Sequence, residues 1–424
     1  MTTRYQVMAA AMLVLTLLAG CAGAELPVES AGTSAATRPP AATEAPTVAA
    51  LPAQRPVVTA TVGTSEDQPA PEGPPLVLTG TLIDGTGADP VPDAVLVIRD
   101  ELIVAAGPRA EVAIPPGARV IDLPGATLLP GFINAHVHNA YQKRNLETWA
   151  QAGVTTVRAL GAPVRGPHFA VRDRLRDDPR YARIVAAGPL VTVPHGYPIA
   201  GNRFPSLTVT SPEDARQKIE QLLDEGADVI KITLESDAGP ILSPEEAAAI
   251  VETAHQRDIP VTAHVTRLDD LQRALDAGVD DIAHIVTDRV STRIIRHMVE
   301  ADVTWVPTLT ALHGRGADNL RRFVKAGGKV ALGNDAGYLE GLEIGMPIRE
   351  IEAMHGAGMT PMQIIVAATG HAAQVCQLDS VLGTLEVGKL ADVLVVDGDP
   401  LHDLQALANV RLVVHSGVVI HAED

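Results

Sequence analysis

Gly131-Phe-Ile-Asn-Ala-His-Val-His138 is a short apolar run that ends in two histidines. In a β-strand, residues two apart point to the same side, so His136 and His138 can place both imidazoles at one end of the strand. The pair alone is weak evidence for a metal site, because a chain with 14 histidines contains such spacings by chance. Its meaning therefore depends on the segments that surround it.

Seven more apolar, strand-like runs follow and alternate with amphipathic segments of helical period. Ser211, Ser243 and Thr360 each precede a proline and mark helix starts, because the hydroxyl caps free amides and proline fits the first turn. The alternation predicts βαβ units, and eight strands in about 250 residues predict a (β/α)8 TIM barrel of the α/β class. A doubly wound open sheet is the alternative, although no glycine-rich phosphate turn follows the first strand. The predicted strands cover residues 131–138, 154–160, 184–193, 229–233, 261–266, 281–286, 304–310 and 330–334.

Polar side chains that can bind metals fall mainly at the C-terminal ends of these strands, where barrel active sites lie. Taken singly, His264 or His284 is more readily explained as a core histidine that bonds to a backbone carbonyl. Taken together with the first-strand pair and Asp335, which follows the last strand, they favour a metal centre. The candidate ligands are His136, His138, Lys231, His264, His284 and Asp335.

Lys231 lies in the apolar run Ala-Asp-Val-Ile-Lys-Ile-Thr, where an unpaired ammonium group is costly to bury. One explanation is an ion pair with Asp228, Glu235 or Asp335. The other is that burial lowers the pKa of the amine, so that the neutral amine takes up CO2 as a carbamate, an anion able to bridge two cations. Asp335, which lies between Gly333 and Gly337, is either part of a plain turn or a carboxylate that binds metal and accepts a proton.

The order of these motifs resembles the amidohydrolase superfamily, in its binuclear subtype and its imidazolonepropionase-like and prolidase-like branch. The motifs are Asn-Ala-His-Val-His, Val-Ile-Lys, Thr-Ala-His, Ile-Ala-His and Gly-Asn-Asp-Ala-Gly, with Gly383-Thr-Leu-Glu-Val-Gly-Lys-Leu-Ala-Asp392 near the end of the chain. Short β-branched runs flank the barrel on both sides. We therefore expect a catalytic barrel over residues 130–381 and a small β-sandwich domain built from 76–129 and 382–424.

The resemblance implies two divalent metal ions, with zinc as the default for these ligands and a carboxylated Lys231 as their bridge. The ions would be held by His136, His138 and Asp335 on one side and by His264 and His284 on the other. A hydroxide shared by both ions would attack an amide-type C–N bond, with Asp335 as general acid and base. The small-molecule substrate would be a dipeptide, an N-acyl amino acid or a cyclic amide, and His195 and Tyr197 would contact it.

The chain departs from the family at Leu234-Glu-Ser-Asp237, where relatives carry small residues, so the contacts around the ligands are expected to differ. One alternative function is a mononuclear heterocycle deaminase on the same fold. Such enzymes place a glutamate three residues after the strand-five histidine, where this chain has Arg267. The other alternative is a non-catalytic, surface-anchored binding protein, which the complete ligand set disfavours.

The first 20 residues are predicted to be a signal peptide, because an arginine precedes an uncharged, mostly apolar run of 14 residues that is too short to span a bilayer. The run ends in Leu-Ala-Gly-Cys21, which resembles the lipobox of bacterial lipoproteins, so Cys21 would carry a lipid. An ordinary secretory signal is the alternative. Residues 21–75 are rich in alanine, proline and threonine and are predicted to be a disordered tether. The sequence thus predicts an extracytoplasmic, membrane-anchored lipoprotein of a bacterium.

The overall composition excludes other classes of partner and scaffold. The chain has 33 lysines and arginines against 51 aspartates and glutamates and carries no basic stripe, so nucleic acid is not expected to bind. Cys21 and Cys376 are the only cysteines, which excludes a disulfide scaffold. The sequence leaves the oligomeric state open between a monomer and a homo-oligomer.

Overall fold

The computed structural model describes residues 73–199 and 206–423, which belong to one compact unit. The predicted signal peptide, Cys21 and nearly all of the predicted tether lie outside the described residues, so these interpretations stay predictions. Within the described part of the chain, no helix is long and apolar enough to cross a membrane.

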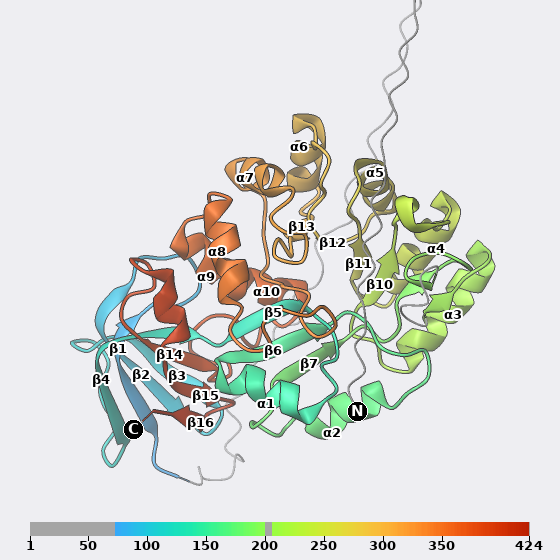
Figure 1. The fold of residues 1–424 in the computed structure, drawn as a ribbon. Helices are drawn as coiled ribbons and strands as arrows, with labels where there is room; N and C mark the ends of the chain where they lie inside the picture. The colour runs from blue at the N-terminus through green and yellow to red at the C-terminus, as the bar shows by residue number, and fades with distance from the viewer. Residues whose placement is uncertain (1–72, 200–205, 424) are drawn as a thin grey trace, which may run out of the picture. The chain divides into compact units, whose positions relative to one another are not determined.

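Parallel strands between residues 132 and 336 form a barrel (Figure 1). Its named strands are β5 (Phe132–Val137), β6 (Val154–Ala159), β7 (Arg183–Ala186), β10 (Ile230–Thr233), β11 (Val261–His264), β12 (Asp281–Ala283) and β13 (Thr304–Val306). Backbone pairing joins β5 to β6 and β6 to β7, and it joins β10 through β11 and β12 to β13. Almost every residue of these strands is buried, as expected when both faces of a parallel sheet are covered.

The predicted third strand is divided in the structure. After β7 the chain bends and then forms β8 (Val191–Thr192), which pairs with β10 and with the short strand β9 (Leu207–Thr208). The link between β7 and β10 is a hydrogen bond of 2.9 Å from the amide of Asp228 to the carbonyl of Ala186.

The predicted eighth strand, 330–334, closes the barrel without forming a named strand. Single parallel bridges join Trp305 to Val330 and Val137 to Ala336, so this segment lies between β13 and β5. The carbonyl of Leu332 also accepts a hydrogen bond of 2.7 Å from the amide of Ala135. The segment therefore occupies the position of an eighth strand, and Asp335 follows it.

Helices follow the strands and lie on the outside of the barrel (Figure 1). They are α1 (Lys143–Gln151), α2 (His168–Leu175), α3 (Pro212–Asp224), α4 (Pro244–His255), α5 (Leu268–Ala277), α6 (Thr292–Glu300), α7 (Ala317–Lys325), α8 (Ile348–Gly356), α9 (Pro361–Ala368) and α10 (Gly370–Val375). The side chains of Ser211, Ser243 and Thr360 each accept a hydrogen bond from the backbone three residues later, so α3, α4 and α9 begin where the sequence predicts. Gly278 ends α5 in the left-handed conformation, with φ 83°.

Strands from both chain ends share one seven-stranded sheet, in the order β16-β15-β14-β4-β1-β2-β3. Their bounds are β1 (Leu76–Leu82), β2 (Val91–Arg99), β3 (Leu102–Pro108), β4 (Arg119–Pro130), β14 (Val393–Asp397), β15 (Val410–His415) and β16 (Val418–Ala422). Strands β1 and β4 are parallel, and β14 pairs antiparallel with β4, which joins the two ends. The sheet has a hydrophobic cluster of its own.

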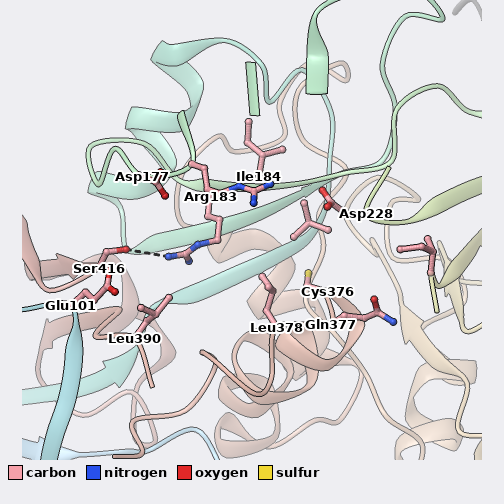
Figure 2. A pocket seen from close by; sticks show the side chains of 13 residues that line it. Glu101, Asp177, Arg183, Ile184, Asp228, Cys376, Gln377, Leu378, Leu390 and Ser416 are labelled. Carbon is pink, nitrogen blue, oxygen red and sulfur yellow. Dashed lines mark hydrogen bonds between the residues drawn. The ribbon is translucent and has the colours of Figure 1, made fainter. Parts of the chain in front are cut away.

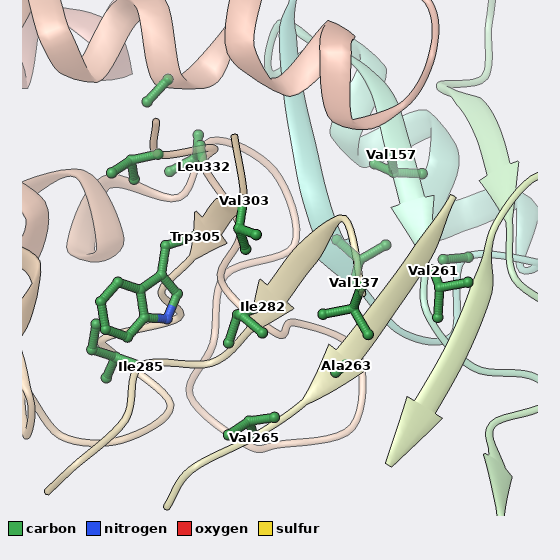
Figure 3. Close-up of a cluster of buried hydrophobic side chains, with 14 of the residues drawn as sticks. Val137, Val157, Val261, Ala263, Val265, Ile282, Ile285, Val303, Trp305 and Leu332 are labelled. Carbon is green, nitrogen blue, oxygen red and sulfur yellow. The ribbon is translucent and has the colours of Figure 1, made fainter. Parts of the chain in front are cut away.

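The barrel core consists of apolar side chains from several strands, as Figure 3 shows for Val137, Ile282 and Trp305. Each of these three residues is fully buried. The indole Nε1 of Trp305 donates a hydrogen bond of 2.7 Å to the backbone carbonyl of His284. Tight packing thus fixes the backbone from which the polar residues at the strand ends extend.

Candidate metal centre

The six predicted ligands, which we call the ligand cluster, come from different strands of the barrel. Lys231 lies within β10 and His136 within β5, whereas His264 is the last residue of β11. His138, His284 and Asp335 directly follow β5, β12 and the closing segment. Five of the six therefore lie at or near the C-terminal ends of the strands, and the sixth extends from inside the barrel.

The two first-strand histidines both lie close to the carboxylate of Asp335. Its Oδ1 lies 3.2 Å from Nε2 of His136 and 3.0 Å from Nε2 of His138. One donor atom from each of these three residues lies within 4.8 Å of the others, a spacing that can hold a metal ion.

The remaining two histidines continue the cluster. The ring centroids of His136 and His284 are 4.8 Å apart, and those of His284 and His264 are 4.3 Å apart. The structure thus brings together all four histidines that the sequence singled out as ligands.

Burial favours the neutral form of three of these imidazoles. It lowers the pKa of His136 to about 3, with a further contribution from Lys231, and it also lowers the pKa of His264 and of His284. Burial alone would raise the pKa of Asp335, but His136 and His138 outweigh it and hold the pKa of this carboxyl well below its usual range. Neutral imidazole and ionised carboxylate are the forms that bind metals.

Lys231 is 1% exposed, and among the described residues its amine has no hydrogen-bond partner. Among the described residues, no ion pair joins Lys231 to Asp228, Glu235 or Asp335. Asp228 pairs with Arg172, and Glu235 lies beside His264. Asp335 lies beside His136 and His138. Burial lowers the pKa of Lys231 to about 7, although Asp281 opposes the shift. The explanation by an ion pair to Asp228, Glu235 or Asp335 is therefore wrong.

Three residues at the cluster have a strained backbone. His284, Thr308 and Asp335 have φ of 75°, 45° and 60°, in the left-handed region that residues other than glycine seldom adopt. Such conformations cost on the order of 1–3 kcal/mol each and are found most often at functional sites.

Tyr197 and His195, the two predicted substrate contacts, differ in their surroundings. The ring of Tyr197 stacks on that of His264, with 4.6 Å between centroids. His195 is exposed, and no hydrogen bond or ring contact joins it to the ligand cluster among the described residues. The ring of Tyr338, which the sequence did not single out, lies 5.0 Å from that of His138 and is 48% exposed.

Other polar residues around the cluster were also missed as site residues. Arg158 on β6 forms a bidentate ion pair with Asp281 on β12, and both side chains are buried inside the barrel. The hydroxyl of Thr308 lies 2.8 Å from Nδ1 of His284. Arg158 and Asp281 carried a signal, since each is a charged residue in an apolar strand, whereas nothing in the local sequence marks Thr308.

A cavity of about 510 Å³ opens away from the cluster, at the N-terminal ends of β7 and β10. Figure 2 shows Arg183, Asp228 and Cys376 around it, with a hydrogen bond from the guanidinium of Arg183 to the hydroxyl of Ser416. Arg183 and Asp228 already take part in ion pairs. Because active sites of parallel barrels lie at the C-terminal ends of the strands, we do not place the chemistry in this cavity.

Comparisons with known proteins bear on the same region. A model of the Amidohydrolase family matches residues 127–420. An imidazolonepropionase from Symbiobacterium thermophilum is 26% identical over 368 residues, which cover 74% of this chain and 85% of that protein. An ochratoxinase from Aspergillus niger is 25% identical over 418 residues, which cover 80% of this chain and 84% of that protein. Among solved structures, a Xaa-Pro dipeptidase with bound methionine in the active site has a TM-score of 0.73 and 26% identity, over 81% of this chain and 99% of that one.

Proposed function

Because this chain belongs to the amidohydrolase family and is a hydrolase that acts on C–N bonds, we propose that it cleaves an amide-type bond in a small molecule with two divalent metal ions. The observation that carries the proposal is the meeting of His136, His138 and Asp335, whose donor atoms lie within 4.8 Å of one another. Two more histidines and a buried lysine adjoin them.

The donor chemistry of the cluster fits metal ions. Both ring nitrogens of His136 and Oδ1 of Asp335 are buried without a hydrogen-bond partner among the described residues. Polar atoms left in this state are costly unless a ligand satisfies them. One ion would be held by His136, His138 and Asp335, the other by His264 and His284, with carboxylated Lys231 as the shared ligand. Bound there, the ions supply a water that is nucleophilic near neutral pH and a Lewis acid for the substrate carbonyl.

Asp335 moves the proton in this reaction. Its carboxylate accepts the proton that the attacking water loses and delivers it to the leaving nitrogen, so that the amide yields a carboxylic acid and an amine. His136 and His138 adjoin the carboxylate, with Nε2 of the two rings 3.2 Å and 3.0 Å from its Oδ1. Tyr197 covers one face of His264 and limits the approach of bulk water from that side.

We propose dipeptides, N-acyl amino acids and cyclic amides as the substrate class. The similar proteins include a dipeptidase and an imidazolonepropionase, which supports this choice. The rings of Tyr197 and Tyr338 at the cluster favour an apolar group next to the bond that is cleaved.

The experiment is metal analysis of the purified full-length protein together with a hydrolysis screen of these three substrate classes. We expect about two divalent ions per chain, loss of hydrolysis with a chelator, and recovery when zinc is added. An active protein with a firm ratio of one ion per chain that deaminates a heterocycle would favour the mononuclear alternative. A metal-loaded protein that turns over none of these compounds would favour the binding protein.

A further inference from the structure

We propose that Glu235 and Thr308 are positioning residues that decide which ring nitrogen each neighbouring histidine presents to a metal ion. Glu235 directs Nδ1 of His264 towards the ion, and Thr308 directs Nε2 of His284. The inference rests on the proposed function, because it takes these two histidines as metal ligands.

Glu235 lies two residues after the end of β10 and is 9% exposed. Its Oε2 lies 3.3 Å from Nε2 of His264 and accepts a hydrogen bond of 2.6 Å from the hydroxyl of Thr266. A carboxylate can only accept, so the proton of the His264 ring lies on Nε2. The lone pair that remains for a metal ion is then on Nδ1.

Thr308 contacts Nδ1 of His284, whereas Glu235 contacts Nε2 of His264. The Oγ1 of Thr308 lies 2.8 Å from Nδ1 of His284 and is the partner of this nitrogen. Because the hydroxyl already occupies Nδ1, Nε2 is the ring nitrogen left for a metal ion. Its lone pair is available when Nδ1 carries the proton and donates it to the hydroxyl. The two imidazoles therefore present different nitrogens.

The position of Thr308 is held from outside the cluster. This residue is fully buried and has φ 45°, which a β-branched side chain rarely adopts. The carboxylate of Glu350 on α8 accepts hydrogen bonds of 2.7 Å and 2.8 Å from the amides of Leu309 and Thr310. The strained turn is thus fixed by contacts that begin one residue after Thr308.

Neither imidazole can flip without losing its polar contact. A half-turn of either imidazole would place a carbon where Glu235 or Thr308 now meets a nitrogen. The rings of His264 and His284 also pack edge to face, with 4.3 Å between centroids and 68° between planes. Each ring therefore stays in the orientation that its partner sets, and the ligand geometry is formed before a metal ion binds.

The first test measures zinc affinity by competition with a chelating dye. Glu235→Ala and Thr308→Ala should each lower the affinity for one of the two ions by roughly 10- to 100-fold. This is the usual effect of losing a residue that hydrogen-bonds to a metal ligand. Glu235→Gln and Thr308→Ser keep an acceptor and should retain most of the affinity. Asp237→Ala is the matched control, because its carboxylate pairs with Arg267 at the surface, 3.2 Å away. Wild-type affinity in both alanine variants, or an equal loss in the control, would overturn the proposal.

The second test does not depend on bound metal. Two-bond 1H–15N spectra of the metal-free protein report which nitrogen of each histidine carries the proton. We expect the proton of His264 on Nε2 and that of His284 on Nδ1, and a mixture of tautomers at His264 in Glu235→Ala. The reverse tautomers in the wild-type protein would refute the positioning roles. A wild-type protein that binds one ion but shows the expected tautomers would contradict the two-metal function and leave this inference standing.

Discussion

Asp335 is the carboxylate that both His136 and His138 face, and its backbone, with φ 60°, suits asparagine equally well. We expect Asp335→Asn to keep the fold and to lower kcat by roughly a hundredfold or more, because an amide cannot accept the proton of the attacking water. The measurement is kcat on the best substrate of the screen, with the urea midpoint as a control for folding. Wild-type turnover in this variant would mean that the proton moves through another group.

Lys231 has a buried amine without a hydrogen-bond partner among the described residues, next to histidines that would hold cations. A plain ammonium group there would repel those cations, whereas a carbamate supplies one negative charge and two oxygens. We expect Lys231→Ala to lose both metal and activity, and short carboxylic acids such as acetate to restore part of each by filling the space. Metal content and kcat are measured with and without the acid.

The matched control for Lys231 is Lys329→Ala, since Lys329 pairs with Asp302 at the surface at 2.8 Å. This control should keep full metal content and activity. If Lys231→Ala binds two ions and turns over normally without added acid, the bridging role is refuted.

Between β13 and α8, one buried carboxylate organises the connection. Glu350 accepts hydrogen bonds from Leu309 and Thr310, and burial raises its pKa to about 7. Between pH 4.5 and about pH 7, the folded protein keeps a proton on Glu350 that the unfolded chain has released. The group therefore favours folding at low pH, and this contribution is lost as the pH rises through about 7.

We expect the stability of the wild-type protein relative to Glu350→Gln to fall as the pH is raised, by up to roughly 3 kcal/mol in total. The measurement is the free energy of unfolding in urea at pH 5 and at pH 8.5 for both proteins. Glu245→Gln, a change at an exposed position in the first turn of α4, serves as the control and should follow the wild type at both pH values. Parallel pH profiles for the wild type and Glu350→Gln would contradict this origin of the pH dependence.

Across the barrel, strands β6 and β12 are connected by the ion pair of Arg158 and Asp281, whose side chains are 0% and 2% exposed. Thr262 on β11 adds a hydrogen bond of 2.6 Å to the same carboxylate. We expect Arg158→Met to destabilise the fold by about 3–5 kcal/mol, because it leaves the charge of Asp281 buried and unpaired.

The measurement for this ion pair is the free energy of unfolding by urea. The control is Arg109→Met, which breaks a surface ion pair with Asp93 and should leave the unfolding midpoint unchanged. Equal midpoints for Arg158→Met and the wild type would show that the buried pair contributes no net stability.

For the molecule as a whole, we propose that a lipid on Cys21, outside the described residues, anchors the enzyme on the extracytoplasmic side of a bacterial membrane. We expect Cys21→Ser to abolish lipid labelling and membrane attachment and to leave hydrolysis unchanged, because some fifty residues separate this position from β1. Cys376→Ala is the control, since the thiol of Cys376 is buried and should take no lipid. Labelling with radioactive palmitate followed by membrane fractionation makes the measurement, and a lipid-labelled Cys21→Ser protein would exclude this anchor.

Much of the fold was predictable from the sequence, because it depends on interactions between residues close together in the chain. The capped starts of α3, α4 and α9 depend on residues three positions apart, and the strands carry continuous apolar runs. The residues of the ligand cluster stood out as candidates because polar groups in apolar strands are costly to bury. The break between β7 and β8 and the bridge-like closing segment were not predictable, because they depend on how neighbouring strands meet.

The sequence alone thus determined the order of the main strands and helices, the helix caps and the chemical types of the candidate ligands, since each follows from neighbours along the chain. Only the tertiary structure decided that Lys231 has no ion pair with the residues that the structure describes, that Glu235 faces His264 and that Arg158 meets Asp281, 123 residues away. The physical reason is that a side-chain contact depends on the register and tilt of strands far apart in the sequence. The barrel sets both only when it closes.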